Sequence, residues 1–227
     1  MGQQFCTLTQ KSLIFRGFLR FLGGITILQL LPVFSGRNPG FLFEQTAEIN
    51  SGGGITLSGG ECLAQPDFCV ELAKLLHERD ISVYVDTCGC VKRETFEKII
   101  PYVDKFLYDI KAIDATVHER CTGKENDLIL ENLKYLCGEG CKIEIRYPLV
   151  MGYNDRECEN IAKFLSGLQG ITKVKVLQYH SFSASRYEAL GMLNTLPDTQ
   201  TTLYNIEAAV NIFKSYGVHA VNGMRED

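Results

Sequence analysis

From residue 51 onward, short runs rich in β-branched and aromatic residues alternate with longer segments in which apolar residues recur every three or four positions. The short runs predict strands at 55–57, 82–86, 105–111, 142–150, 173–180 and 218–221. The longer segments predict helices at 66–79, 92–102, 127–139, 155–168 and 199–216. Strands joined by helical crossovers pair in parallel, either in an open doubly wound sheet or in a barrel. Periodicity does not separate these two α/β folds.

Residues at the helix boundaries support this pattern. Pro66 followed by Asp67 is a favourable helix start, since proline is tolerated in the first turn and a carboxylate suits the N-terminal end of the helix dipole. Gly140, Gly170 and Gly217 each follow a helical segment, where a left-handed residue commonly ends a helix. We therefore expect left-handed turns at these three glycines.

Size and charge exclude several classes of protein. A chain of 227 residues can form one sizeable core, and no low-complexity tract marks a linker. The net charge is −4, with acidic and basic residues interspersed, so we expect no nucleic-acid partner. The apolar stretch 18–34 contains Arg20 and Pro32 and is short for a bilayer, so we expect no membrane span. Nine cysteines, an odd number, indicate reduced thiols and a cytoplasmic location.

Polar or special residues stand where each predicted strand ends. Because parallel strands point their carboxyl ends to one side, we expect these residues to converge on a single face. They are the segment 58–61, Asp86 with Thr87, Asp109 with Lys111, Arg146, and Gln178 with His180. The sequence "ITLSGGECL" adds a Gly59-Gly60 turn, where a ligand can approach the backbone because no Cβ stands in the way.

Charged residues within the predicted strands divide into two groups. Asp109 and Lys111 are two positions apart and share one strand face. They follow an apolar strand, where a charged pair is costly to bury unless it faces a cleft, so we interpret them as site residues. We interpret the charges near other strand starts as solvated; these are Lys142, Glu144, Lys173 and Lys175.

Several segments together resemble one family. They are "SGGGITLSGGE", "YVDTCG", "PYVDKFLYDIKAID", "TGKENDLILENLKYL", "IRYPLVMGYND" and "VKVLQYH", which occur in order between about residues 50 and 187. They resemble the glycyl-radical-enzyme activating enzymes, typified by the pyruvate formate-lyase activating enzyme, within the radical S-adenosylmethionine superfamily. The resemblance implies a partial parallel β/α barrel, an incomplete TIM-like barrel, over residues 51–227. Residues 1–50 form an atypical N-terminal segment before it.

The resemblance also implies cofactors and partners. Members of this family hold S-adenosylmethionine and a 4Fe-4S cluster at the carboxyl end of the barrel. The reduced cluster cleaves S-adenosylmethionine to a 5′-deoxyadenosyl radical, which takes a hydrogen atom from a glycine of a partner glycyl-radical enzyme. A flavodoxin or ferredoxin is the expected reductant, and anaerobic metabolism is the expected setting.

Residue roles follow from the same resemblance. The edge formed by Gly59, Gly60 and Glu61 receives the methionyl amino group, and backbone carbonyls at such a turn can accept its hydrogen bonds. Asp109 and Lys111 match the family's Asp-x-Lys, which contacts the cofactor, and Lys111 suits the cofactor's carboxylate as a point charge.

The remaining matches concern other parts of the cofactor. His180 matches the histidine at the nucleoside end, and Arg146 matches a strand-end arginine near the cofactor. Asp86 is a further cofactor-site residue. Together with Thr87 and Asp109, it offers the oxygen ligands that a hard monovalent cation prefers.

One expected motif is missing. The superfamily binds its cluster through a Cys-x3-Cys-x2-Cys loop, but before Cys62 this sequence contains only Cys6. Cys62, Cys88 and Cys90 are weak replacement candidates, because they follow two strand ends without the triad spacing. A frame slip or truncation upstream is one hypothesis, which an intact cysteine loop in another frame of the encoding DNA would support. The alternative function is an inactive S-adenosylmethionine-binding or protein-interaction module derived from the family.

Overall fold

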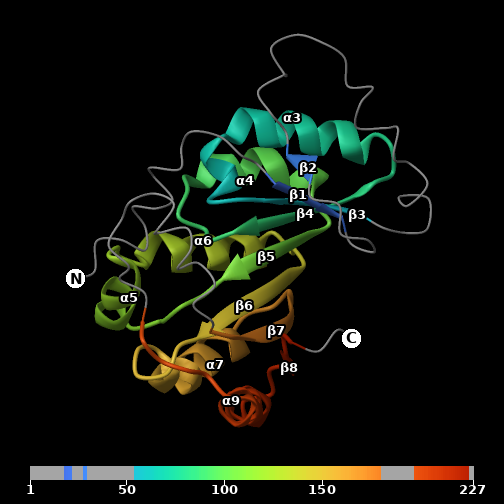
Figure 1. The fold of residues 1–227 in the computed structure, drawn as a ribbon. Helices are drawn as coiled ribbons and strands as arrows, with labels where there is room; N and C mark the ends of the chain where they lie inside the picture. Colours follow the sequence, from blue (N-terminus) through green and yellow to red (C-terminus); the bar gives the residue numbers. More distant parts are fainter. Residues whose placement is uncertain (1–17, 22–27, 30–53, 180–196, 225–227) are drawn as a thin grey trace.

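The computed structural model describes residues 18–21, 28–29, 54–179 and 197–224, and these ranges form one α/β fold (Figure 1). Six strands pair in parallel in chain order: β3 (Gly54–Ser58), β4 (Ser82–Thr87), β5 (Lys105–Asp109), β6 (Ile143–Leu149), β7 (Ile171–Gln178) and β8 (Ala220–Asn222). The short strand β1 (Phe18–Phe21) pairs antiparallel with β3, and β2 (Leu28–Gln29) pairs antiparallel with β1.

The strand order distinguishes the two folds that periodicity left open. The order is β2-β1-β3-β4-β5-β6-β7-β8, so the parallel strands β3 to β8 lie side by side in chain order and this order never reverses across the sheet. A doubly wound sheet reverses its strand order at a switch point, whereas a barrel does not. Within the described strands β2 and β8 lie at opposite ends of the order. The fold is therefore a partial β/α barrel whose sheet stays open.

Helices follow the strands. They are α3 (Pro66–His77), α4 (Arg93–Ile99), α5 (Ala115–Thr122), α6 (Asp127–Gly138), α7 (Cys158–Ser166) and α9 (Leu203–Ser215), with short 3₁₀ turns at Cys62–Ala64, Ile100–Tyr102 and Asp155–Glu157. Figure 1 shows α3 and α4 beside β3 and β4, and α7 and α9 near β7 and β8. No helix in these described ranges combines the length and the apolar character needed to cross a bilayer.

Most predicted boundaries are confirmed within a few residues. Gly140, Gly170 and Gly217 adopt φ values of 73°, 82° and 75°, the left-handed turns that the sequence predicts. The prediction missed α5, which has only eight residues and few apolar ones. Two local signals mark it. Asp114 caps it by accepting a hydrogen bond from the Val117 amide, and Gly123 ends it at φ 75°.

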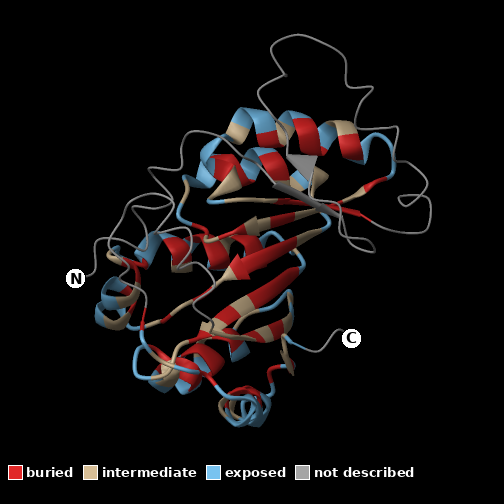
Figure 2. Ribbon diagram, viewed as in Figure 1, coloured by how far each residue is buried: buried red, intermediate tan, exposed pale blue. Residues whose placement is uncertain are grey.

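Alternate residues of the parallel strands face two different environments. One set packs against the helices in a continuous apolar core, in which Val83, Val85, Phe106, Tyr108 and Ile145 are at most 1% exposed. Figure 2 shows buried residues in red along the central strands and in the helices beside them. The opposite face, called here the polar face, carries side chains that are mostly charged and half-buried. We define it by Ser58, Asp86, Asp109, Glu144, Arg146 and Lys175.

Candidate functional site

The turn after β3 requires glycine at two consecutive positions. Gly59 has φ 114° and Gly60 has φ 59°, both in the region that L-residues rarely adopt. Gly60 is exposed, so a ligand can reach its backbone without meeting a side chain. This geometry explains why the strand ends in Gly-Gly.

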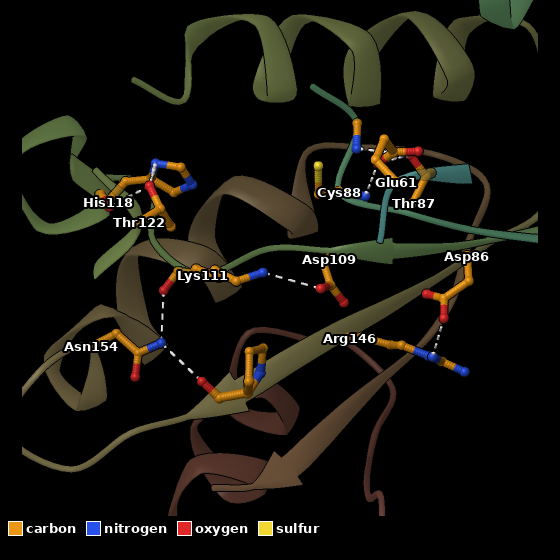
Figure 3. Close-up of polar contacts among 12 residues, drawn as sticks. Glu61, Asp86, Thr87, Cys88, Asp109, Lys111, His118, Thr122, Arg146 and Asn154 are labelled. Atoms are coloured by element: carbon orange, nitrogen blue, oxygen red, sulfur yellow. Dashed lines mark hydrogen bonds and ion pairs between the residues drawn. The ribbon is translucent and has the colours of Figure 1, made fainter. Parts of the chain in front are cut away.

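The Glu61 carboxylate is already held by its own chain. It accepts hydrogen bonds from the Thr87 hydroxyl, 2.9 Å from each oxygen, and from the Cys88 amide at 2.8 Å (Figure 3). It also accepts from the Leu63 amide at 3.1 Å. Burial raises the pKa of Glu61, although these hydrogen bonds oppose that shift. The side chain therefore ties the end of β3 to the end of β4, and the neighbouring glycine backbone remains the part accessible to a ligand.

Asp86 joins three strands on the polar face. Its Oδ2 lies 3.1 Å from Nη1 of Arg146 on β6 (Figure 3). The same oxygen accepts a hydrogen bond from the Ser58 hydroxyl at 2.8 Å. Burial raises the pKa of Asp86, and the Arg146 guanidinium opposes this shift. A carboxylate and a guanidinium are thus fixed side by side between β4 and β6.

Asp109, the last residue of β5, forms an ion pair with Lys111, which lies just beyond the strand. The Lys111 ammonium lies 3.0 Å from Asp109 Oδ2, and this contact confirms that the two side chains lie on the same side. The Lys111 and Asp109 side chains are 25% and 32% exposed. Burial lowers the pKa of Lys111, but the Asp109 carboxylate and weaker interactions with nearby groups such as Asp86 together raise it above its ordinary value. Asp109 is also the register partner of Arg146 on β6, so the two charged pairs are neighbours.

One expectation about the polar face is wrong. Glu144 is not a solvated strand start, because it is only 4% exposed. Its carboxylate lies 3.9 Å from the Lys173 ammonium and 3.6 Å from that of Lys175, both on the adjacent strand. The position of Glu144 in its own strand does not indicate that the neighbouring strand supplies two cations. These cations allow the Glu144 carboxylate to be buried.

Other predicted site residues are distributed as follows. Thr87 and Asp86 are adjacent and point to opposite faces, so the Thr87 hydroxyl contacts Glu61 rather than the Asp86 pair. Gln178 also points away from the polar face and donates to the Thr201 carbonyl. His180 lies outside the described residues. The strands that bring predicted groups together are β3, β4, β5 and β6.

The cysteines near these strand ends do not resemble cluster ligands. Cys62 directs its thiol toward the carbonyls of Leu57 and Asp86, at 3.6 and 3.5 Å. A hydrogen bond with Cys69 and burial raise the pKa of Cys62 far above its ordinary value, and burial raises the pKa of Cys88. The thiolate is the form that binds metal. Within the described ranges, no group of three or more His, Cys, Asp or Glu side chains is placed to hold a metal ion.

Sequence reasoning missed three buried polar residues beside the site. Asn154, Glu157 and Asn126 are 2%, 4% and 1% exposed, and each bonds to the backbone of residues 111–114. The available signal was "GYND", in which Asn154 and Asp155 follow a strand as turn residues do. It indicates a turn but does not indicate what the turn holds.

A parallel β/α sheet with charged pairs at the carboxyl ends of its strands defines the class of β/α-barrel proteins that bind ligands at this end. The profile of the radical SAM superfamily matches residues 42–165, more than half of the chain. The chain belongs to this superfamily. Membership implies S-adenosylmethionine and a 4Fe-4S cluster as cofactors.

Curated relatives fall in one functional group. The chain is 43% identical over 145 residues to a trans-4-hydroxy-L-proline dehydratase activating enzyme from Clostridioides difficile, covering 62% of this chain and 48% of the relative. It is 39% identical over 171 residues to a choline trimethylamine-lyase activating enzyme from Oleidesulfovibrio alaskensis, covering 73% and 53%. The chain thus spans about half the length of the curated relatives it matches.

Solved structures agree on the fold. A domain of a pyruvate-formate lyase-activating enzyme from Bacteroides vulgatus superposes with a TM-score of 0.64 at 26% identity, covering 75% of this chain and 98% of that domain. SuiB from Streptococcus suis, in a structure bound to S-adenosylmethionine, gives a TM-score of 0.60 at 15% identity, covering 74% and 38%. At this lower identity the likeness concerns the fold alone.

Proposed function

We propose that this chain is the cofactor-binding barrel of an activating enzyme that uses S-adenosylmethionine to generate a glycyl radical on a partner enzyme. Family membership supports the cofactor class. The names of the curated relatives support the type of activity, since each relative described above is an activating enzyme. The partner is accordingly a glycyl-radical enzyme.

The observation that carries this proposal is the convergence of four strand ends on complementary chemistry. Gly59 and Gly60 leave a backbone edge accessible, and its carbonyls can accept hydrogen bonds from an ammonium group. Lys111 and Arg146 supply cations on the same face, each already beside a carboxylate. The methionyl end of S-adenosylmethionine carries one ammonium and one carboxylate. The backbone carbonyls suit the ammonium, and the two cations suit the carboxylate.

The cluster and the remaining contacts follow from the family and from the sequence. The three thiols near the strand ends do not fit a cluster site, so the 4Fe-4S cluster and its flavodoxin or ferredoxin reductant rest on family membership only. His180 as the nucleoside contact and a cation beside Asp86, Thr87 and Asp109 stay predictions. The division of the chain into 1–50 and 51–227 also stays a prediction.

One sequence observation favours a second candidate function. The 227 residues contain no Cys-x3-Cys-x2-Cys motif. A chain that binds S-adenosylmethionine without a three-thiolate cluster site would act as a binding or protein-interaction module rather than as a radical enzyme. The two candidates share the cofactor site and differ in the cluster.

Calorimetric titration with S-adenosylmethionine tests the shared site. The wild-type chain should bind, and the double variant Asp109→Ala, Lys111→Ala should lose at least about tenfold in affinity, which corresponds to ~1.4 kcal/mol. The matched control is Asp67→Ala, Lys98→Ala, which removes an ion pair whose side chains are 91% and 60% exposed. Equal affinity in both double variants would dismiss the proposed site.

Anaerobic reconstitution with iron and sulfide separates the two candidates. Absorbance and electron paramagnetic resonance after reduction report whether a cluster forms on the folded chain. A cluster signal supports the radical enzyme, whereas cofactor binding without any cluster signal supports the binding module.

A further inference from the structure

A single buried side chain bridges the ends of β5 and β6. Asn154 is 2% exposed and lies in the turn between β6 and α7. Its Nδ2 donates to the carbonyl of Lys111 at 2.9 Å (Figure 3). Nδ2 also donates to the carbonyl of Pro148 at 2.9 Å, and Oδ1 accepts from the Val150 amide at 2.8 Å. Both Nδ2 hydrogens and the amide oxygen are therefore used.

The bridge is anchored in the apolar core. The Tyr147 hydroxyl donates to the Asn154 carbonyl, and the Asn154 amide donates to the Val150 carbonyl at 3.1 Å. Tyr147 is fully buried and packs edge-to-face on Phe213, with ring centroids 5.9 Å apart. Since both the backbone and the side chain of Asn154 are fixed, its position is set by the core rather than by the loop that it holds.

The same turn holds the loop after β5 at a second point. Glu157 is 4% exposed and accepts hydrogen bonds from the amides of Ile113 and Asp114 at 2.8 and 2.9 Å. Asn160 orients it by donating to its other oxygen at 2.8 Å. Residues 111–114 are thus fastened to the start of α7 through one carbonyl and two amides.

Lys111 depends on this fastening because it stands beyond the strand. β5 ends at Asp109, and the last backbone bond to β6 runs from the Ile110 amide to the Arg146 carbonyl at 3.0 Å. The Asn154 bond to the Lys111 carbonyl comes one residue later. We infer that Asn154 is a positioning residue that fixes the Lys111 backbone against β6 and so holds the Lys111 ammonium for the carboxylate of bound S-adenosylmethionine. This inference rests on the proposed function.

A second asparagine offers a matched control. Asn132 is fully buried, and its Nδ2 also donates to two loop carbonyls, those of Gly89 and Val91, each at 2.8 Å. It holds the loop after β4 rather than the one that carries Lys111. If both asparagines only fasten loops, replacing either one should change ligand preference to the same extent. If Asn154 acts through Lys111, replacing Asn154 should change ligand preference more than replacing Asn132.

The test compares two ligands by calorimetry, S-adenosylmethionine and its decarboxylated analogue, which lacks the group assigned to Lys111. The wild-type chain should prefer S-adenosylmethionine. Asn154→Ala should reduce that preference by about tenfold, mainly by weakening S-adenosylmethionine binding, because a misplaced ammonium no longer meets the carboxylate. Asn132→Ala should keep the wild-type preference even where it lowers the affinity for both ligands.

Other outcomes have distinct meanings. An unchanged preference in Asn154→Ala, or an equal loss for both ligands, would overturn the inference while leaving the proposed function intact. Failure of the wild-type chain to bind S-adenosylmethionine would overturn the proposed function and the inference with it. If Asn154→Ala does not fold, Asn154→Gln serves instead, since it keeps both donors but moves them by one methylene. It too should reduce the preference, and full retention would count against the inference.

Discussion

The helix-covered face and the polar face of the sheet are made by neighbouring residues of the same strands, yet different forces hold them. On the helix-covered face, Phe106 and Tyr108 are at most 1% exposed and pack in the apolar core. On the polar face, cations and carboxylates pair across or beyond strands, as Arg146 does with Asp86 and Lys111 with Asp109. Burial of apolar area stabilises folding far more than partly exposed ion pairs do.

This contrast separates stability from binding within a single sheet. Substitutions on the helix-covered face should change the free energy of unfolding and leave ligand affinity nearly unchanged in the folded fraction. Substitutions among the charged pairs at the carboxyl ends should lower ligand affinity and change the free energy of unfolding less, because a zwitterionic ligand can bind the same groups.

The largest effect is expected at Phe96, which is fully buried and packs edge-to-face on Phe106 with centroids 5.8 Å apart. Phe96→Ala should lower the free energy of unfolding by about 4 kcal/mol, since it removes an aromatic ring and leaves a cavity. Urea unfolding followed by circular dichroism measures the change. A loss below ~1 kcal/mol would show that this face is less tightly packed than the structure indicates.

Gly89 sits where the helix-covered face meets the strand-end loop. It has φ 75°, and a Cβ there would lie 1.7 Å from the Tyr108 hydroxyl oxygen. Gly89→Ala should cost about 3 kcal/mol through both backbone strain and overpacking. Gly140→Ala is the control, because Gly140 has φ 73° with nothing within 4 Å of the added Cβ, and it should cost only ~1 kcal/mol. Equal costs by thermal unfolding would contradict the steric argument.

Arg146 tests the polar face. Arg146→Gln should weaken S-adenosylmethionine binding by about tenfold, or ~1.4 kcal/mol, because it removes a cation from the site. The loss of unfolding free energy should stay well below the ~4 kcal/mol expected for Phe96→Ala, since Asp86 keeps the hydrogen bond from Ser58 and its side chain is still 25% exposed to water. The control is Arg93→Gln, which removes an exposed guanidinium stacked over Tyr135. Calorimetry that finds equal affinities in the two variants would contradict the prediction.

How far the sequence predicts the fold depends on the length over which a pattern repeats. The six parallel strands and five of the helices were predictable, because each repeats its apolar pattern over several residues beside the core. α5 was not, since its eight residues contain few apolar positions. The pairing of β1 with β3 was also not predictable, because the apolar pattern of one strand does not indicate which other strand it pairs with.

The site divides in the same way. Asp109 and Lys111 could be paired from the sequence, because two positions along a strand return to the same side. The bond from Asn154 to the Lys111 carbonyl spans 43 residues, and the contact of Glu61 with Thr87 spans 26. Such contacts arise from how strand ends meet in space, so spacing in the sequence cannot reveal them.

Glu144 tests whether the whole polar face serves binding. It is 4% exposed between Lys173 and Lys175, whose side chains are 21% and 29% exposed. Glu144→Gln keeps the volume and removes the charge, so it should cost about 1 kcal/mol of stability, less than for a fully buried pair. Because Glu144 lies earlier along β6 than Arg146, S-adenosylmethionine affinity should stay within about twofold of wild type. A larger loss of affinity would show that the binding site also includes Glu144, nearer the start of β6.

The smallest effect is a pH dependence at Glu61, where the two faces meet. Burial raises the pKa of Glu61 in the folded chain above its ordinary value of 4.5, so the folded state holds this proton more tightly than the unfolded state does. Stability from this group is therefore present near pH 4.5 and is lost as the pH rises through the raised pKa.

Glu61→Gln cannot ionise, so it isolates this contribution from that of Asp86, whose pKa burial also raises. The stability advantage of wild type over Glu61→Gln should increase as the pH falls from about 7 toward 4.5, as measured by urea unfolding at several pH values. An advantage that instead decreases over this range would mean that the hydrogen bonds from Thr87 and Cys88 favour the carboxylate more strongly than burial disfavours it.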